Sequence, residues 1–243
     1  MACYPTVTSL SYSTLKMTIM NSADKYDIKI KAQQLGLFET PVVYSELSNA
    51  EQLMNDLGAA IREQQRVSPG INRSNLGGWH SDTNMLDWGG PAADQLSRSA
   101  ISLAKRMSHF LGGTADDLDW SVRMWANVTS EEGLNQLHAH PGNLWAAVLY
   151  LDMGCNENNE DVGGKFYLED PRFPMCAMRE TALRMIGING QPQQYEVDFN
   201  LARGNLIVFP AWLRHGVRRY TGTRERISIA MNIDAQRRKD SKQ

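Results

Sequence analysis

Three of the five histidines lie in two short motifs, and their spacing suits a metal ion. His138 and His140 are two residues apart in the segment QLHAHP, and His215 follows in the segment WLRHGV. Side chains at i and i+2 of a strand point to one face, about 6.5 Å apart along it, so His138 and His140 can converge on one ion. A later strand lying opposite would let His215 complete one face of an octahedron. An HxH pair alone is more often a pair of structural imidazoles than a pair of metal ligands.

The last strand-like segment carries a second polar pair, Arg226 and Ser228. Alternation over residues 225–233 places both on the face opposite the isoleucines. A planar guanidinium with a hydroxyl two residues away suits a small carboxylate. Taken alone, such a pair is more often a surface arginine on a solvated strand face. The succession of the HxH pair, the segment GNLIVFP, His215 and the Arg-Ser pair favours one shared site.

Several segments together resemble a known family. They are LFETPVV, SNLGGWHS, HAHPGNLWAAVLYLD, GGKFYLEDPR, GNLIVFPAWLRHGV and RERISIAMN. Over residues 37–235 the sequence resembles the Fe(II)/2-oxoglutarate-dependent oxygenases, and more narrowly a bacterial and phage branch with an HxHP motif. The resemblance implies a double-stranded β-helix, or jelly roll. It also implies that His138 and His215 are metal ligands and that Arg226 with Ser228 holds the distal carboxylate of 2-oxoglutarate.

The sequence departs from the superfamily pattern at the second metal ligand. That ligand is usually Asp or Glu, and this chain has His140 there. Three neutral imidazoles would leave the site one unit more positive than two imidazoles and a carboxylate. If His140 turned away, the site would resemble that of the related halogenases, where chloride binds. Pro141 favours an extended conformation at His140, and an imidazole fills the space, so coordination by all three histidines is preferred.

Other residues have weaker signals. By the resemblance, Tyr150 lies where related enzymes place a tyrosine that touches 2-oxoglutarate, although a core aromatic is an equal alternative. Asn127 is expected to point its amide into the pocket, and Lys165 is a rival carboxylate anchor. Residues with mainly structural expectations are Trp145 and Trp212 (core or pocket wall), His80 (a solvated loop residue or a substrate contact), His109 (a charge at a helix C-terminus), and Arg214, Arg218 and Arg219 (a solvated face).

Two amphipathic helices are predicted before these motifs. A capping box formed by Ser48 and Glu51 predicts the start of the first helix, and leucines and an isoleucine repeat after it at one-turn spacing. Pro91 starts the second helix, which Gly112 and Gly113 stop. An edge strand is expected at residues 37–44, because Pro41 cannot donate to a ladder. The Gly- and Asn-rich loop at residues 68–90 is a candidate substrate lid.

From Trp120 the period changes to two, which is typical of strands. The predicted strands are 121–128, 144–152, 164–169, 194–199, 205–209, 213–219 and 225–233. The expected fold is therefore α+β, a jelly-roll core with N-terminal helices packed on it. Residues 1–34 are expected to form a loosely ordered extension, and residues 35–243 a single oxygenase domain.

Composition narrows the function classes. The 243 residues are 42% hydrophobic and carry 25 Lys and Arg against 27 Asp and Glu, so no global basic field favours nucleic acid. Three widely spaced cysteines predict a reducing compartment, and neither a leader nor a membrane span is recognised, so a cytoplasmic protein is expected.

The function expected from the resemblance is a hydroxylase using Fe(II) and 2-oxoglutarate on a small molecule or peptide, with release of succinate and CO2. A homodimer is left open, as is the identity of the substrate. Two alternatives are a cupin-like three-histidine iron dioxygenase that does not use 2-oxoglutarate, and a jelly-roll binding module without catalysis.

Overall fold

The computed structural model describes residues 16–20, 29–154, 161–172, 180 and 182–238, and it divides into two compact units. The smaller unit comprises Met1–Thr40 and Phe173–Tyr195. Within it, β1 (Lys16–Met20) pairs antiparallel with β2 (Lys29–Gln33), and the Gln34 amide donates to the carbonyl of Ile186 (2.7 Å). The extension and domain boundaries predicted from the sequence remain predictions, and all three cysteines lie outside the described residues.

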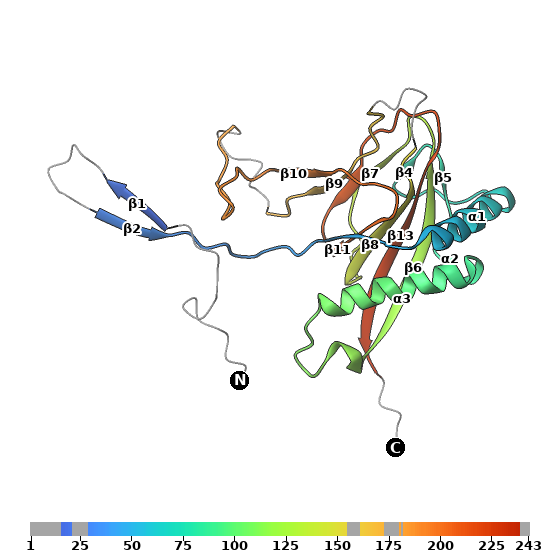
Figure 1. Ribbon diagram of the computed structural model, residues 1–243, viewed down its shortest axis with the longest axis horizontal. Coiled ribbons are helices and arrows are strands. Elements are labelled where there is room, and N and C mark those ends of the chain that lie inside the picture. Colours follow the sequence, from blue (N-terminus) through green and yellow to red (C-terminus); the bar gives the residue numbers. More distant parts are fainter. Residues whose placement is uncertain (1–15, 21–28, 155–160, 173–179, 181, 239–243) are drawn as a thin grey trace, which may run out of the picture. The chain divides into compact units, whose positions relative to one another are not determined.

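The larger unit, Pro41–Arg172 with Glu196–Gln243, is built on two antiparallel sheets (Figure 1). The six-stranded sheet has the order β3 (Val43–Glu46), β11 (Asn205–Pro210), β8 (Trp145–Asp152), β13 (Arg226–Arg237), β6 (Leu118–Thr129) and β5 (Trp79–His80). The five-stranded sheet has the order β10 (Glu196–Phe199), β9 (Phe166–Glu169), β12 (His215–Val217), β7 (Leu134–His138) and β4 (Asn75–Leu76). The predicted jelly-roll class is thereby confirmed.

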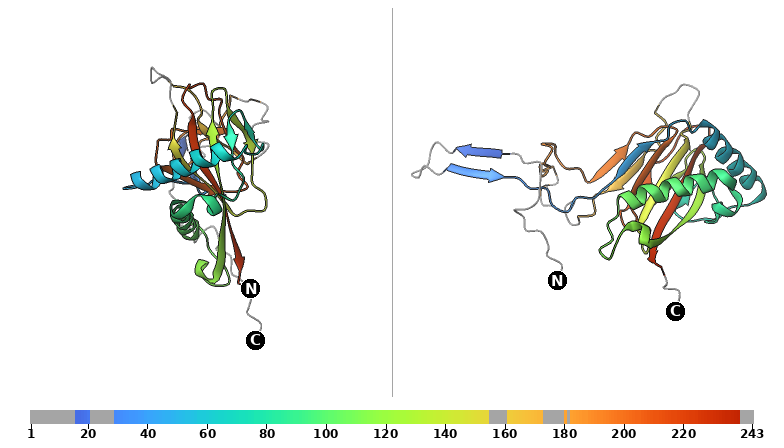
Figure 2. Two further views of the ribbon diagram at one scale, coloured as in Figure 1. Left: turned by 90° about the vertical axis from the view of Figure 1, so that its right-hand side faces the viewer. Right: turned by 60° about the horizontal axis from the view of Figure 1, so that its bottom comes forward.

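Helices cover the outer face of the six-stranded sheet (Figures 1 and 2). The helices are α1 (Glu51–Val67), α2 (Met85–Trp88) and α3 (Gly90–Arg106), and a 3-10 turn, η2, spans Ala115–Asp117. Leu57 and Ile61 of α1 and Leu96 of α3 are fully buried, as their helical spacing predicts. No helix of the described residues is both long and apolar enough to cross a membrane.

The long strand β13 separates two apolar clusters. Its residues Ile227, Ile229, Met231 and Ile233 belong to the cluster shared with the helices, which confirms the alternation seen in the sequence. A second cluster draws on both sheets. It contains Ala146, Tyr150, Phe166, Leu168, Ile207, Phe209, Ala211 and Leu213. Packing on both faces of the six-stranded sheet fixes the register of β13, because a one-residue shift would reverse every side chain.

Local predictions around the helices were partly wrong. Asn49 has a left-handed φ of 53°, so α1 begins at Glu51 with Ala50 as its N-cap, and Ser48 forms no cap. The edge strand is β3, later than predicted, and Pro41 lies just before it. The loop at 68–90 contains β4, β5 and α2, which join the body of the unit. β7 (Leu134–His138) is absent from the predicted strands, although the argument from the HxH spacing assumed a strand at His138.

Candidate active site

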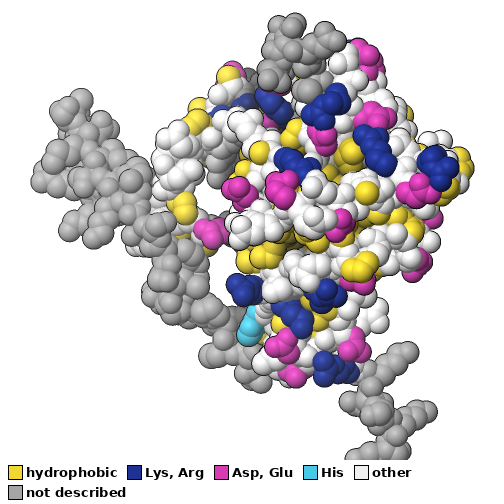
Figure 3. Space-filling view, turned by 45° about the vertical axis from the view of Figure 1, so that its right-hand side comes forward, with side chains coloured by type: hydrophobic (Ala, Val, Ile, Leu, Met, Phe, Trp, Pro, Cys, Tyr) yellow, Lys and Arg dark blue, Asp and Glu magenta, His cyan; other side chains and the backbone are white. Residues whose placement is uncertain are grey.

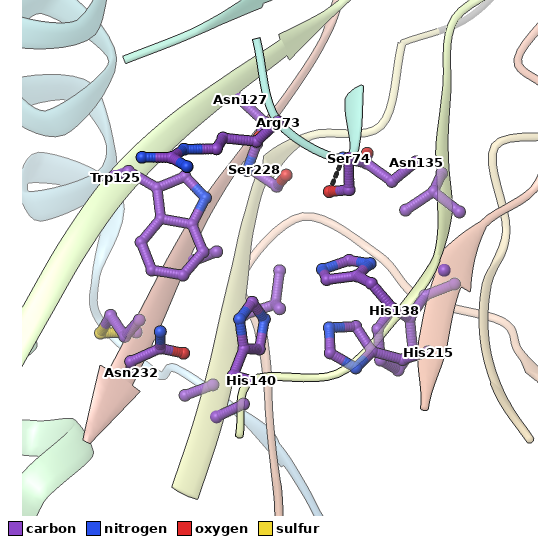
Figure 4. A pocket seen from close by; sticks show the side chains of 18 of the residues that line it. Arg73, Ser74, Trp125, Asn127, Asn135, His138, His140, His215, Ser228 and Asn232 are labelled. Atoms are coloured by element: carbon purple, nitrogen blue, oxygen red, sulfur yellow. Dashed lines mark hydrogen bonds between the residues drawn. The ribbon is translucent and has the colours of Figure 1, made fainter. Parts of the chain in front are cut away.

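Three imidazoles, two from neighbouring strands and one from the segment that follows the first strand, meet inside the larger unit (Figure 4). The ring centroids are 4.4 Å apart for His138 and His215, 4.9 Å for His138 and His140, and 5.0 Å for His140 and His215. One nitrogen from each ring lies within 4.8 Å of the others. This spacing allows three nitrogen atoms to bind one metal ion, and the predicted convergence of the three histidines is present.

Strand pairing explains the convergence. His138 and His215 are direct cross-strand partners in the antiparallel pair β7 and β12, so their side chains share one face. The sequence had suggested opposing strands, whereas the two are adjacent in one sheet. His140 follows the end of β7, and its backbone N–H donates to the Ala211 carbonyl (2.9 Å), which keeps the segment extended and places this ring beside the other two.

Backbone carbonyls fix the tautomers of two rings. Nδ1 of His138 lies 2.7 Å from the Gln136 carbonyl oxygen, and Nδ1 of His215 lies 2.9 Å from the Leu213 carbonyl oxygen. Because a carbonyl only accepts, each Nδ1 carries the proton and donates it. The lone pair of each ring is then on Nε2. Such carbonyl partners are the usual orienting groups of metal-binding histidines.

Burial keeps the three imidazoles neutral near pH 7. It lowers the pKa of His215 to about 3 and that of His140 to about 4, and it also lowers the pKa of His138. The neighbouring imidazole of His138 and, for His140, the charge of Arg123 act in the same direction. Neutral rings have free lone pairs, so no proton has to be displaced before a metal ion binds.

A row of polar side chains crosses three strands beside the histidines. Ser228 of β13 is paired with Asn127 of β6 on one side and with Tyr150 of β8 on the other. All three are at least nine-tenths buried and line the cavity that also contains the histidines. The Tyr150 hydroxyl and the Asn127 Oδ1 have no hydrogen-bond partner among the described residues. Burial raises the pKa of Tyr150 to about 12, so the phenol is a neutral donor.

Arg226 is a buried cation without a described counter-ion. Its residue is 1% exposed, its guanidinium carbon lies 4.9 Å from the centre of the Tyr150 ring, and its Nε and Nη2 have no hydrogen-bond partner. Burial lowers the pKa of Arg226, and the group nevertheless remains charged. A buried charge is costly unless it is paired, so this arrangement suits an anion that the chain itself does not supply.

The histidines, Asn127, Tyr150 and Ser228 line a cavity with a volume of about 520 Å³. Arg226 is not among the residues that line it and reaches it only through its contact with the Tyr150 ring. Ala146, Val148 and Phe209 form part of its apolar wall, and β6 contributes Trp125 and Asn127. This volume lies within the usual range for small-molecule sites.

Comparison with known proteins places this site in a family. Residues 123–232 match a family model described as "Putative 2OG-Fe(II) oxygenase". The match covers 110 of the 243 residues, and most of them belong to the larger unit. The family is one of oxidoreductases, and it implies Fe(II) and 2-oxoglutarate as cofactor and co-substrate. The matched segment contains the three histidines, Arg226 and Ser228. No curated protein matches the chain.

Several solved structures share the fold of this chain. A prolyl-4-hydroxylase from Pseudomonas putida has a TM-score of 0.53 and 16% identity, over 80% of this chain and 92% of that one. A Trichoplax adhaerens prolyl hydroxylase, in complex with a peptide fragment of hypoxia inducible factor, has a TM-score of 0.55 and 12% identity, over 79% and 83%. HygX from Streptomyces hygroscopicus, with nickel and 2-oxoglutarate bound, has a TM-score of 0.53 and 14% identity, over 80% and 83%.

The larger unit places the remaining candidates differently. Lys165 pairs with Asp161 on the surface and does not line the cavity. Trp145 is in the core, but Trp212 is 53% exposed, so its predicted place in the core or pocket wall was wrong. His80 is buried and stacked on Trp125 (5.8 Å), rather than solvated.

Surface predictions for the remaining charged residues agree with the structure. His109 is exposed and lies beyond the end of α3. The three arginines expected on a solvated face each pair with acidic side chains at the surface, and they are Arg214, Arg218 and Arg219.

Several residues that line the cavity were not singled out from the sequence, among them four polar or aromatic ones. Arg123 and Trp125 precede Asn127 on the same face of β6, and period-two alternation would have found both. Asn232 lies on the predicted polar face of β13. Arg73 comes from the loop before β4, and no local pattern marks it.

Proposed function

We propose that the protein hydroxylates a C–H bond of a small molecule or peptide side chain, with conversion of 2-oxoglutarate to succinate and CO2. The observation that supports this most directly is the pairing of two sites in one cavity region. Three neutral imidazoles gather at one point, and the buried guanidinium of Arg226 lies on the same strand face as Ser228. A metal ion would bind the three imidazoles, and one carboxylate of a dicarboxylate would pair with the guanidinium.

The histidines are proposed as the complete protein ligand set of Fe(II). His138 and His215 offer Nε2 atoms whose orientation is fixed by backbone carbonyls, and His140 offers a ring held at 4.9 to 5.0 Å from the other two. A neutral set leaves the whole charge of the metal to be balanced by the co-substrate and by other anions. The donor set therefore fits a metal site with open positions for exogenous ligands.

The distal carboxylate of 2-oxoglutarate is proposed to bind Arg226 and Ser228. A carboxylate can accept from the unpaired guanidinium N–H groups, and the serine hydroxyl adds a further donor. The Tyr150 hydroxyl is the neighbouring donor, and Asn127 lies on the other side of Ser228. These contacts would satisfy the Tyr150 hydroxyl and the Nε and Nη2 groups of Arg226, which have no partner among the described residues.

In this family the bound metal and co-substrate supply oxidative decarboxylation coupled to oxidation of the substrate. The chain contributes position and exclusion of water. Carbonyl hydrogen bonds hold the imidazoles in the tautomer that presents lone pairs, and the guanidinium fixes the orientation of the dicarboxylate. Apolar residues such as Ala146 and Phe209 keep water away from the reacting end.

Anaerobic reconstitution tests the proposal. Purified protein receives Fe(II) and then 2-oxoglutarate, and the expected result is a weak visible charge-transfer absorption, followed by succinate release on admission of air. Arg226→Met is expected to retain the metal and lose the absorption. Absence of both signals in the wild type rejects the proposal. Turnover that requires neither 2-oxoglutarate nor Arg226 would indicate the cupin-like alternative. Purified protein that contains no stoichiometric metal would indicate a binding module.

A further inference from the structure

The cavity holds a set of polar residues that the proposed cofactors do not use. Arg73, His80, Arg123 and Asn232 line the cavity together with Trp125. His80 stacks on Trp125, and Figure 4 shows Arg73 and Asn232 beside the same indole. The Arg73 guanidinium lies over one side of the indole, and the Asn232 amide lies near its other side, toward His140. This group occupies the part of the cavity beside the metal centre where a second substrate must bind, so the following argument rests on the proposed function.

The charge of this group is not balanced by the protein. Among the described residues that line the cavity, none is aspartate or glutamate. Bound 2-oxoglutarate would bring two negative charges, which offset the two positive charges of Fe(II). The charges of Arg73 and Arg123 are then left over, together with that of the deeper Arg226. By contrast, basic and acidic side chains alternate over the face of the protein that Figure 3 shows.

The two cavity arginines, Arg73 and Arg123, are both exposed to solvent, and they differ from exposed arginines such as Arg214 in their partners. Arg123 donates only to the neutral Asn143 Oδ1 (2.6 Å), whose own amide reaches the His140 carbonyl (3.2 Å). The Arg73 guanidinium makes no hydrogen bond or ion pair with any residue that the structure describes. By contrast, Arg214 pairs with Glu169 outside the cavity. Arg123 is thus anchored beside the metal centre with donors to spare.

Asn232 supplies an independent indication of a ligand. It is 9% exposed and is the direct cross-strand partner of Arg123. Its Oδ1 is buried and has no hydrogen-bond partner among the described residues. A buried acceptor without a partner is costly, so a donor from a bound molecule would stabilise it. An amide acceptor beside a guanidinium suits a ligand with an N–H or O–H next to an anionic group.

We propose that the oxidised substrate is a small molecule with a carboxylate or phosphate that Arg123 and Arg73 bind, and an adjacent N–H or O–H that donates to Asn232. Trp125 forms the wall between Arg73 and Asn232. Arg123 contributes more than Arg73, because the hydrogen bond to Asn143 already limits its freedom. The arginines thereby hold the substrate by its anionic end, with its reacting carbon toward the histidines.

Matched ligands test the charge preference directly. Full-length protein is loaded with Zn(II), which prevents turnover, and with saturating 2-oxoglutarate, which fills the Arg226 site. Binding of hippurate, of its uncharged amide hippuramide and of phenyl phosphate is then measured by saturation-transfer NMR. Hippurate carries an N–H next to its carboxylate, and hippuramide differs only in charge. We expect the preferred anion to bind about tenfold more tightly than hippuramide, which corresponds to one charge-assisted hydrogen bond.

Variants identify the contacts. Arg123→Gln is expected to weaken hippurate about tenfold and to leave hippuramide nearly unchanged, and Arg73→Gln to weaken hippurate about threefold. Asn232→Leu is expected to weaken both ligands, because both donate the same N–H. Arg214→Gln removes an arginine outside the cavity and is expected to change neither. Thermal unfolding of each variant checks that the fold is retained. The tighter of hippurate and phenyl phosphate identifies the anion.

Two outcomes would overturn the inference. One is equal affinity for charged and uncharged ligands, including no binding by any of them up to the limit of solubility. The other is hippurate binding that displaces 2-oxoglutarate or is unchanged in Arg123→Gln. Failure of the proposed function looks different, because the wild type would then not bind 2-oxoglutarate. In that case the anion preference is measured in Arg226→Met, where it must still depend on Arg123.

Discussion

Replacing Arg226 with methionine should have opposite effects on the cofactor-free and the loaded protein. The guanidinium is 1% exposed, and its Nε and Nη2 have no described partner. Such a group lowers the stability of the protein until an anion binds it. Methionine fills a similar volume with an unbranched, flexible and uncharged side chain. The variant therefore removes an uncompensated charge from the empty protein and removes the anchor from the loaded one.

The magnitude of each effect can be worked out. Replacing buried charged groups with apolar side chains of similar volume stabilises proteins by about 1–4 kcal/mol. For a domain of this size, 1 kcal/mol moves the unfolding temperature by roughly 2–4 °C. Cofactor-free Arg226→Met should therefore unfold a few degrees above the wild type. In the wild type, 2-oxoglutarate at about one hundred times its Kd adds about 2.7 kcal/mol, and this increment should disappear in the variant.

The assay is thermal unfolding of Zn(II)-loaded protein with and without 2-oxoglutarate. Arg224→Met is the matched control, because Arg224 lies two residues earlier, its side chain is 54% exposed and it pairs with Asp152. The control should keep the full increment from 2-oxoglutarate. If Arg226→Met unfolds below the wild type when empty and still gains stability from 2-oxoglutarate, Arg226 is a structural group and the reasoning is refuted.

Three further predictions follow from the same geometry. His138→Ala should lower metal affinity more than about 100-fold in a calorimetric titration, whereas the exposed His109→Ala should not; equal losses would contradict the three-histidine site. Tyr150→Phe removes a buried hydroxyl without a described partner. In urea unfolding, the cofactor-free variant should therefore be as stable as the wild type or up to about 1 kcal/mol more stable, while the Kd of 2-oxoglutarate should rise several-fold. A less stable variant would mean that the hydroxyl makes a hydrogen bond within the protein. Gly78→Ala, where φ is +88° and a Cβ would lie 2.2 Å from the Val128 carbonyl oxygen, should lose clearly more stability in urea than Gly142→Ala, where φ is +86° and no atom lies within 4 Å.

Features set by local geometry could be predicted from the sequence. Alternation along β13 assigned Ile227, Ile229 and Ser228 to their observed faces, because successive side chains of any strand point to opposite sides. The partners of that strand could not be predicted in the same way. β13 lies between β6 and β8, and pairing between segments so far apart depends on the whole fold rather than on local pattern.

The three residues of the histidine site were predicted, but the elements that carry them were not. The HxH spacing suggested two ligands on one strand face, whereas His138 ends β7 and His140 lies after it. β7 itself was missed, because its residues Asn135 and Gln136 line the cavity and interrupt the alternation expected of a half-buried strand. The burial of His80 was missed for a related reason. Stacking on Trp125 joins a loop to β6, and neither segment alone indicates the contact.

The two ends of the cavity take their side chains from different kinds of element. This difference determines which ligand can be inferred from a family resemblance. The end proposed for 2-oxoglutarate uses one row of paired strands, Asn127, Ser228 and Tyr150, which the sheet register fixes. The end proposed for the substrate combines Arg123 on β6 with Arg73, which precedes the two-residue strand β4. Loop residues can change without disturbing the sheet, so a shared strand pattern identifies the common co-substrate and leaves the substrate to be inferred from charge and unpaired polar atoms.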